Sequence, residues 1–145
     1  MTDENVRTVE INRIRKGLYE ATNRHGVKMV FGHDNTQNFS AVELLLTAIA
    51  GCSGTDVDFI TSKRSEPASF KLNIFGEKVR DEAGKNHVAN ISLTFDISFP
   101  EGEEGDAARA VLERSVHQSH DRLCSVSQTV ERGTPINIEI AGENT

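Results

Sequence analysis

The chain contains no tryptophan, a single tyrosine and only two cysteines. Flat aromatic side chains on which nucleic-acid bases could stack are therefore scarce. The two cysteines, Cys52 and Cys124, are expected to be reduced in a cytoplasmic protein, where glutathione and thioredoxin systems keep thiols free. A purely structural disulfide is therefore not the expected role of this pair.

Positive charge is also limited. Lys and Arg together number 16 against 22 Asp and Glu, which gives a formal net charge of −6, and no basic run stands out. Nucleic acids and anionic membrane surfaces attract proteins that carry a surplus of Lys and Arg. Neither is therefore expected to be the main partner of this chain.

Long apolar runs are missing as well. The N-terminal sequence MTDENVRTVEI is polar and acidic and has no stretch of signal-peptide type. The longest apolar run, around Leu44–Cys52, has about half the length that a bilayer-spanning helix requires. A cytoplasmic location is the resulting expectation.

The size and composition fit one ordinary globular domain. The chain has 145 residues, of which 37% are hydrophobic and 26% charged. A chain of this length builds one modest core and hardly two. We therefore predict a single domain over residues 1–145.

The first part of the chain is predicted to be extended. Val6–Thr22 alternates imperfectly between apolar and polar residues, and Gly17 is expected to mark a bulge or a bend. The tetrapeptide Asn23–Gly26 has the composition of a hairpin turn. Val27–Phe31 then resumes the alternation, as expected for a short partner strand.

The later segments predict two central strands, two helices and a final strand. Val88–Phe99 shows the cleanest alternation in the chain, which is typical of a half-buried antiparallel strand. The elements expected around it are a strand at Ser69–Arg80, a helix at Glu101–His120, a short helix at Ser125–Arg132 and a strand carrying Ile136, Ile138 and Ile140. The order ββαββααβ predicts an α+β fold with mostly antiparallel strands and helices on one face.

A long helix is predicted from Ser40 to about Lys63. Ser40 is a suitable N-cap residue, and Glu43 stands three residues later, as in a capping box. Leu44–Ala50 is apolar at nearly every position, so this helix must be covered on all sides. One sheet covers one side only. The remaining sides require another helix or a second subunit.

The two cysteines differ in their local sequence. Cys52 lies in the middle of the apolar helix, where a thiol is inert unless a cation or a helix N-terminus stabilises its thiolate. Cys124 stands just before the short helix, where free backbone N–H groups favour a thiolate, and Arg122 is close in sequence. The two lie 72 residues apart, which fits no local redox or zinc pattern. A working pair would need tertiary contact.

Two other arrangements of the second cysteine remain open at this point. On an unbroken helix His117, His120, Asp121 and Cys124 would share one face and could bind zinc. The same residues could also form a Cys–His–Asp hydrolytic centre. The zinc site requires the helix to continue past Asp121, where we expect it to break. The hydrolytic centre would be unusual, because its candidates crowd one segment, whereas such triads are usually assembled from distant parts of the chain.

Both cysteine stretches resemble the motifs of a known family. SAVELLLTAIAGCSGTDV is similar to the first cysteine motif of the OsmC/Ohr family, the osmotically inducible and organic-hydroperoxide-resistance proteins. SHDRLCSVSQTVERGTPINI is similar to the second motif, and the likeness is greatest to the OsmC-like branch. The resemblance implies an OsmC-like α+β fold with mostly antiparallel sheets, a long central cysteine-bearing helix and an intertwined homodimer.

The resemblance also implies a chemistry. In the family the first cysteine attacks a hydroperoxide and the second resolves the product as a disulfide, which assigns these roles to Cys52 and Cys124. An external dithiol, of lipoyl type in the Ohr branch, then reduces the disulfide. Neither a metal nor a prosthetic group is expected. A redox sensor or a small-ligand-binding dimer without catalysis is the alternative function.

The residues that would activate the thiol are less clear in this chain. Family members use an N-terminal Arg and a Glu that precedes the first cysteine. The Arg corresponds best to Arg15 and second best to Arg13. The Glu position falls on Val42, with Glu43 one residue later and turned about 100° around a helix.

Overall fold

The computed structural model describes residues 3–33 and 37–142, and these form two compact units. The first unit comprises the described residues up to Thr47 together with Gly76–Asn90. The second comprises Ala48–Phe75 and the described residues from Ile91 onward. The α+β class with antiparallel sheets and one long helix is confirmed. The assignment of one domain to residues 1–145 stays a prediction.

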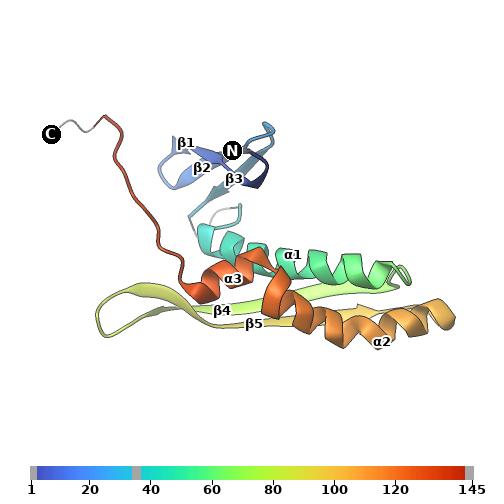
Figure 1. Cartoon of the computed structure of the whole chain (residues 1–145). Helices are drawn as coiled ribbons and strands as arrows, with labels where there is room; N and C mark the ends of the chain where they lie inside the picture. Colours follow the sequence, from blue (N-terminus) through green and yellow to red (C-terminus); the bar gives the residue numbers. More distant parts are fainter. Residues whose placement is uncertain (1–2, 34–36, 143–145) are drawn as a thin grey trace. The chain divides into compact units, whose positions relative to one another are not determined.

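The first unit contains a three-stranded antiparallel sheet, which follows a short 3₁₀ helix at Asp3–Asn5. Its strands are β1 (Val9–Arg15), β2 (Leu18–Asn23) and β3 (Lys28–Gly32), in that order (Figure 1). The prediction of an extended segment over Val6–Thr22 with a bulge or bend at Gly17 is confirmed in part: both sides are extended, but the chain reverses completely at Gly17 and so forms two strands. This glycine has a φ of 79°, which favours a residue without a Cβ.

Helix α1 (Ala41–Ser62) begins where its capping box predicts. The Ser40 N–H donates to Glu43 Oε1 at 2.9 Å, and the Glu43 N–H donates to Ser40 Oγ at 3.2 Å. Gly54 allows a close approach to β4, since a Cβ there would lie 2.5 Å from Leu72 Cδ1. The absence of a side chain at Gly54 therefore lets α1 pack closely on β4, two residues after Cys52.

Strands β4 (Ser69–Arg80) and β5 (Asn86–Ser98) pair as a long hairpin. The two predicted central strands are thus confirmed, with β5 ending one residue earlier than expected. Asn90 lies within β5 and has a φ of 55°, a conformation that Asn tolerates better than most residues. The division between the two units falls directly after this residue.

The C-terminal helices are α2 (Glu103–Gln118) and α3 (Ser125–Arg132), joined by a π-helical turn at Ser119–Leu123. Both helices were predicted, and α3 has the predicted bounds. Gly133 ends α3 in the left-handed conformation, with a φ of 64°. The expected break near Asp121 takes the form of the π-helical turn.

In the second unit the helices cover one face of the hairpin. The part of α1 from Ala48 onward, α2 and α3 lie along the β4–β5 ribbon (Figure 1). The Gly54–Leu72 contact joins α1 to β4. The side chains of Val57, Ala108 and Cys124 have 0% exposure, so the core of this unit lies between its helices.

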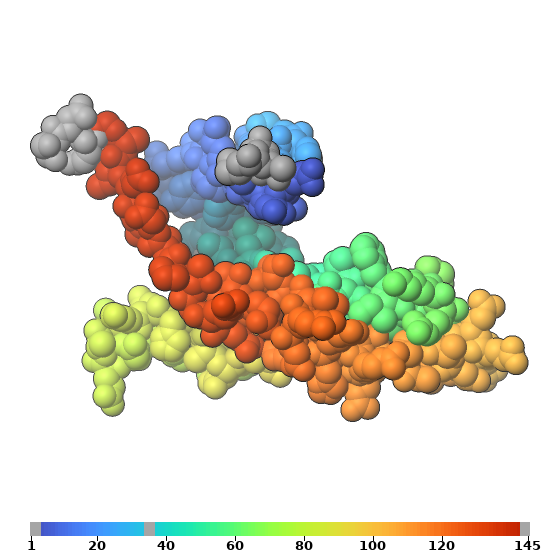
Figure 2. Space-filling view, in the orientation of Figure 1, coloured from blue at the N-terminus to red at the C-terminus, as the bar shows by residue number. Residues whose placement is uncertain are grey.

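The predicted final strand is absent from the described residues. Ile136, Ile138 and Ile140 alternate as expected, but their segment makes no strand pairing, and they are 86%, 83% and 70% exposed. Figure 2 shows the segment after α3 projecting from the helices of its own unit. The alternation predicted an extended backbone correctly, but a strand also needs a partner edge.

Helix α1 is not covered on all sides by this chain. Leu45 is 36% exposed and Phe59 is 68% exposed, although Val57 is completely buried. By length and composition α1 is also the one helix among the described residues that could cross a bilayer, a test that the core helix of a soluble protein passes too. The exposed apolar side chains of α1 therefore still require an additional element to cover them.

Candidate active site

The two cysteines meet in the second unit. Cys52 Sγ, Cys124 Sγ and a carboxylate oxygen of Asp56 all lie within 4.8 Å of one another. Both thiols are free. The structure thus brings together two cysteines that are distant in sequence and adds a carboxylate that the sequence analysis did not single out.

The π-helical turn positions Cys124. Its backbone N–H donates to Ser119 O at 2.8 Å across the wider turn, which ends the helical path there. Cys124 then becomes the N-cap of α3, and its sulfur accepts the Ser127 N–H at 3.3 Å. The side chain is completely buried. The sulfur is therefore held by backbone geometry at the start of a helix.

The surroundings of Cys124 favour its thiolate. Burial raises the pKa of this thiol, but hydrogen bonds from Ser127, Ser53 and the Cys52 thiol outweigh it, so the pKa lies below its ordinary value. Donors aimed at a sulfur stabilise its charged form, as does a helix N-terminus. The sequence prediction of a thiolate-favouring position at Cys124 agrees with this environment.

The surroundings of Cys52 have the opposite effect. Burial raises the pKa of its thiol above the ordinary value, and the charges on Cys124 and Asp56 add to this, while the backbone of Val126 lowers it. Cys52 is nevertheless only half-buried, whereas Cys124 is enclosed. The more accessible sulfur is thus the one that holds its proton more tightly.

Asp56 links α1 to the π-helical turn. Its Oδ2 accepts a hydrogen bond from Ser119 Oγ at 2.8 Å, and Ser119 is completely buried. Asp56 follows Cys52 by four residues, which places both side chains on one face of the helix. This spacing is the only signal in the sequence that could have pointed to Asp56.

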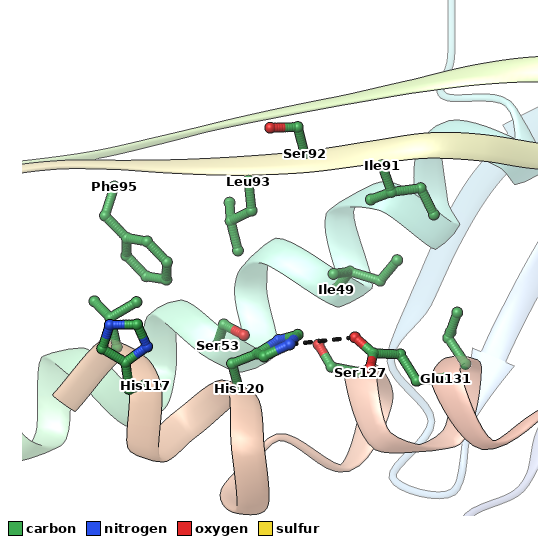
Figure 3. A pocket seen from close by; sticks show the side chains of 12 residues that line it. Ile49, Ser53, Ile91, Ser92, Leu93, Phe95, His117, His120, Ser127 and Glu131 are labelled. Carbon is green, nitrogen blue, oxygen red and sulfur yellow. Dashed lines mark ion pairs between the residues drawn. The ribbon is translucent and has the colours of Figure 1, made fainter. Parts of the chain in front are cut away.

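A cavity of about 470 Å³ lies between β5 and the helices of the second unit. In Figure 3 Ile49, Leu93 and Phe95 point into it, opposite His120 and Glu131. Ser53 and Ser127, which hydrogen-bond to Cys124, also line it. The cavity therefore reaches the immediate surroundings of the buried thiol, although neither cysteine lines it.

The predicted histidine ligands do not join the thiols. His120 Nε2 lies 3.3 Å from Glu131 Oε2, and His117 Nε2 lies 3.9 Å from Glu113 Oε1. Among the described residues, only Cys52, Asp56 and Cys124 gather as a possible metal-binding set. A zinc site made of His117, His120 and Cys124 is therefore wrong, because the π-helical turn rotates Cys124 off their face.

The other predicted site residues belong to the first unit. Arg15 ends β1 and is exposed. Glu43 is exposed, and its carboxylate accepts the Ser40 N–H in the capping box. Val42, at the family's Glu position, is half-buried. The catalytic roles expected for Arg15 and Glu43 stay predictions.

Comparison with known proteins identifies the class. A sequence model of the family described as OsmC-like protein matches residues 32–139. Since this match covers well over half of the chain, the protein belongs to the OsmC-like family. An uncharacterized protein of Mycobacterium tuberculosis is 24% identical over 132 residues, which cover 90% of this chain and 93% of that protein.

Solved structures share the fold at low sequence identity. A hypothetical protein from Aquifex aeolicus is 24% identical, with a TM-score of 0.71 and coverage of 90% of both chains. An OsmC-like protein of unknown function from Vibrio cholerae is 16% identical, with a TM-score of 0.67 over 86% of this chain and 93% of that one. The organic hydroperoxide resistance protein OhrB of Bacillus subtilis is also 16% identical, with a TM-score of 0.56 over 86% and 90%.

The hydrogen bonds to Cys124 lead to a testable expectation. In a Cys52→Ser background, which leaves one thiol to titrate, Ser127→Ala should raise the pKa of Cys124. The reason is that the substitution removes a hydroxyl that donates to the thiolate. The ultraviolet absorbance of the thiolate as a function of pH measures this change.

Ser125→Ala in the same background is the matched control. Ser125 is exposed in the first turn of the same helix, and its backbone oxygen accepts from Thr129 Oγ1. Its replacement should leave the titration unchanged. Equal midpoints for the two serine variants would show that the Ser127 hydroxyl does not stabilise the thiolate.

Proposed function

We propose that this protein reduces organic hydroperoxides through the thiols of Cys52 and Cys124. The observation that carries the proposal is the meeting of two free cysteine sulfurs from α1 and the start of α3, within 4.8 Å. Membership of the OsmC-like family gives this pair a peroxide-related context. Proteins named for organic hydroperoxide resistance are among the structural neighbours.

The two cysteines take different roles because they differ in access. Cys52 is the attacking residue, since its half-buried sulfur is open to a substrate that cannot reach the enclosed Cys124. Its thiolate bonds to one oxygen of the O–O bond, which breaks, and the other oxygen leaves as the alcohol after taking the proton that Cys52 has passed to Cys124, which leaves Cys124 as a thiolate. Cys52 is then a sulfenic acid. The Cys124 thiolate attacks its sulfur, water leaves, and a disulfide joins the two residues.

Proton transfer within the pair prepares this reaction. The lowered pKa of Cys124 and the raised pKa of Cys52 place the proton on Cys52 and the negative charge on Cys124 in the reduced state. The hydrogen bond between the sulfurs gives a direct route for that proton to move to Cys124. Cys52 then becomes the nucleophile without release of a proton to solvent.

Arg15 and Glu43 are proposed to complete the activation. A guanidinium beside Cys52 would lower the thiol pKa that burial and Asp56 raise. Glu43 is the nearest available carboxylate in sequence to the position now held by Val42, and it would orient the arginine. Because Glu43 also caps α1, its contribution should be smaller than that of Arg15.

The apolar cavity supports an organic substrate. Its lining includes Ile49, Leu93 and Phe95, and its polar end includes Ser53 and Ser127, which contact the buried sulfur. An apolar group of a hydroperoxide would lose contact with water there. An external dithiol, of lipoyl type, would then reduce the disulfide by exchange. The proposed cycle uses no metal and no prosthetic group, and we place it in the cytoplasm.

The active form is proposed to be an intertwined homodimer. The exposed apolar side chains of α1, among them Leu45 and Phe59, require a cover that one chain does not give them. The alternating Ile136, Ile138 and Ile140 have no partner strand in the described residues. A second copy of the chain would supply both.

A non-catalytic role is the second candidate. Val42 replaces the family's activating carboxylate, and the pKa of Cys52 is raised. A slow, stoichiometric oxidation of the same pair would suit a redox sensor or a ligand-binding dimer better than an enzyme. Repeated reduction of peroxide in the presence of a dithiol would distinguish an enzyme from a redox sensor or a ligand-binding dimer.

The first expected outcome is a peroxide-driven disulfide. The reduced protein, treated with one equivalent of cumene hydroperoxide, should form a Cys52–Cys124 bond that peptide mass spectrometry detects. With dihydrolipoamide present, peroxide should continue to disappear. Because Cys52 passes its proton to the Cys124 thiolate, the rate should fall as the pH is lowered through the pKa of Cys124, which lies below its ordinary value.

The single-cysteine variants provide the controls. Cys52→Ser should abolish peroxide consumption, while Cys124→Ser should consume one equivalent and stop at the sulfenic acid. A disulfide without turnover would favour the sensor. Two inert thiols would reject both redox functions.

The second expected outcome concerns activation. Arg15→Gln should lower the rate constant for peroxide reduction by about tenfold, the effect of one pKa unit on the thiolate fraction. Arg13→Gln is the control on the same strand, and Glu43→Gln should have the smaller effect. If Arg13→Gln slows the reaction more than Arg15→Gln, the assignment of the arginine is wrong.

The third expected outcome concerns assembly. Light scattering should give twice the mass of one chain, and Ile138→Lys should reduce this mass or its stability on dilution, because it places a charge on the apolar face of the proposed strand. Asn137→Lys, on the opposite face, should leave the mass unchanged. A monomeric parent protein would overturn the dimer proposal.

A further inference from the structure

The site contains a third group that the proposed peroxide chemistry leaves unused. Asp56 lies one turn after Cys52 on α1, and one of its carboxylate oxygens lies within 4.8 Å of both sulfurs. The Oδ2 atom of Asp56 accepts a hydrogen bond from Ser119 Oγ. The charge of this carboxylate raises the pKa of Cys52 and so disfavours its thiolate, which means that the peroxide chemistry does not explain why Asp56 lies beside the sulfurs.

We propose that Cys52, Asp56 and Cys124 form a binding site for a thiophilic divalent cation of the Zn²⁺ class. Two ligands come from successive turns of one helix, and the third comes from the N-cap of another. Two sulfurs and one oxygen suit zinc, whereas magnesium and calcium prefer oxygen alone.

The spacing of the three atoms fits a tetrahedral ion. Zinc–sulfur bonds of about 2.3 Å and zinc–oxygen bonds of about 2.0 Å place tetrahedral ligand atoms roughly 3.4–3.8 Å apart. The observed separations do not exceed 4.8 Å, so each has to shorten by at most about 1.0–1.4 Å to close the site. Side-chain rotation at the half-buried Cys52 can supply most of this movement.

The surroundings have further features of a metal site. The Ser119 hydroxyl holds Asp56 Oδ2 at 2.8 Å, which fixes the carboxylate as outer groups fix metal ligands. The Ser127 N–H, 3.3 Å from the sulfur, holds Cys124 in place. Cys52 and Asp56 are half-buried, so an ion can enter from solvent and keep a water as its fourth ligand.

Metal binding would exclude the disulfide. Two sulfurs that bond to each other cannot both bind the ion as thiolates, so the reduced protein binds zinc and the oxidised protein releases it. With a hydroperoxide as oxidant, the two thiolates lose two electrons, the oxygens take up two protons to give alcohol and water, and the ion leaves. Only this release of the ion on oxidation depends on the proposed peroxide-reducing function; zinc binding by the reduced protein does not. The ion would inhibit peroxide reduction and is not a cofactor for it.

The test uses reduced full-length protein and no peroxide, so failure of the peroxidase proposal does not affect its outcome. Competition with a zinc chelator should give one Zn²⁺ per chain. Co²⁺ in place of zinc should show thiolate-to-metal absorption bands. Cys52→Ser and Cys124→Ser should each weaken these bands, and protein oxidised to the disulfide should bind neither ion.

Asp56→Asn separates the proposed site from a simple pair of thiols. Its zinc affinity should fall at least tenfold, since even outer-shell changes cost about 10–100-fold. Asp58→Asn is the matched control, because Asp58 lies on the same helix, is half-buried and accepts from Ser62 Oγ at 2.9 Å outside the cluster. Its affinity should be unchanged.

Ser119→Ala gives an independent variant if Asp56→Asn does not fold. Loss of the hydroxyl should weaken zinc binding while both sulfurs and the carboxylate remain. Failure of the reduced parent protein to bind one zinc would overturn the proposal. Equal affinities for Asp56→Asn, Asp58→Asn and the parent would overturn it as well.

Discussion

The hydrogen bond from Ser119 to Asp56 joins segments that lie 63 residues apart in sequence. It ties the π-helical turn to α1 at the level where the two sulfurs meet. Because Ser119 is completely buried and Asp56 half-buried, this bond is partly shielded from competing water. The same turn delivers Cys124 to the start of α3. The meeting of the cysteines thus depends on one polar contact between two helical segments.

The two thiols that meet there differ in access and in ionisation. Cys124 is buried, held by the first turn of α3 and stabilised as a thiolate, while Cys52 is accessible and holds its proton. A pair arranged this way places the negative charge on the enclosed sulfur. Access and ionisation are therefore separate properties here, and the proposed reaction would require the proton to move from one sulfur to the other.

The sequence predicted most elements whose signals are local. The capping box of Ser40 and Glu43 located the start of α1, and alternation located β4 and β5. The turn at Gly17 was taken for a bend, because strands on both sides of a tight reversal continue the same alternation. Asp56 was missed, since a carboxylate one turn from a cysteine is informative only once Ser119 and Cys124 are seen beside it. The prediction of a strand carrying Ile136, Ile138 and Ile140 was wrong for a related reason. Alternation indicates an extended backbone but does not show whether a partner strand is available.

The uncovered isoleucines after α3 have a consequence for the newly made chain. A segment with alternating isoleucines and free backbone groups can pair with any exposed strand edge, including that of an unrelated unfolded protein. Pro135 stands at its start and Glu139 lies within it, and such residues limit the growth of aggregates. The yield of native protein should therefore depend on how quickly this tail finds its correct edge during synthesis.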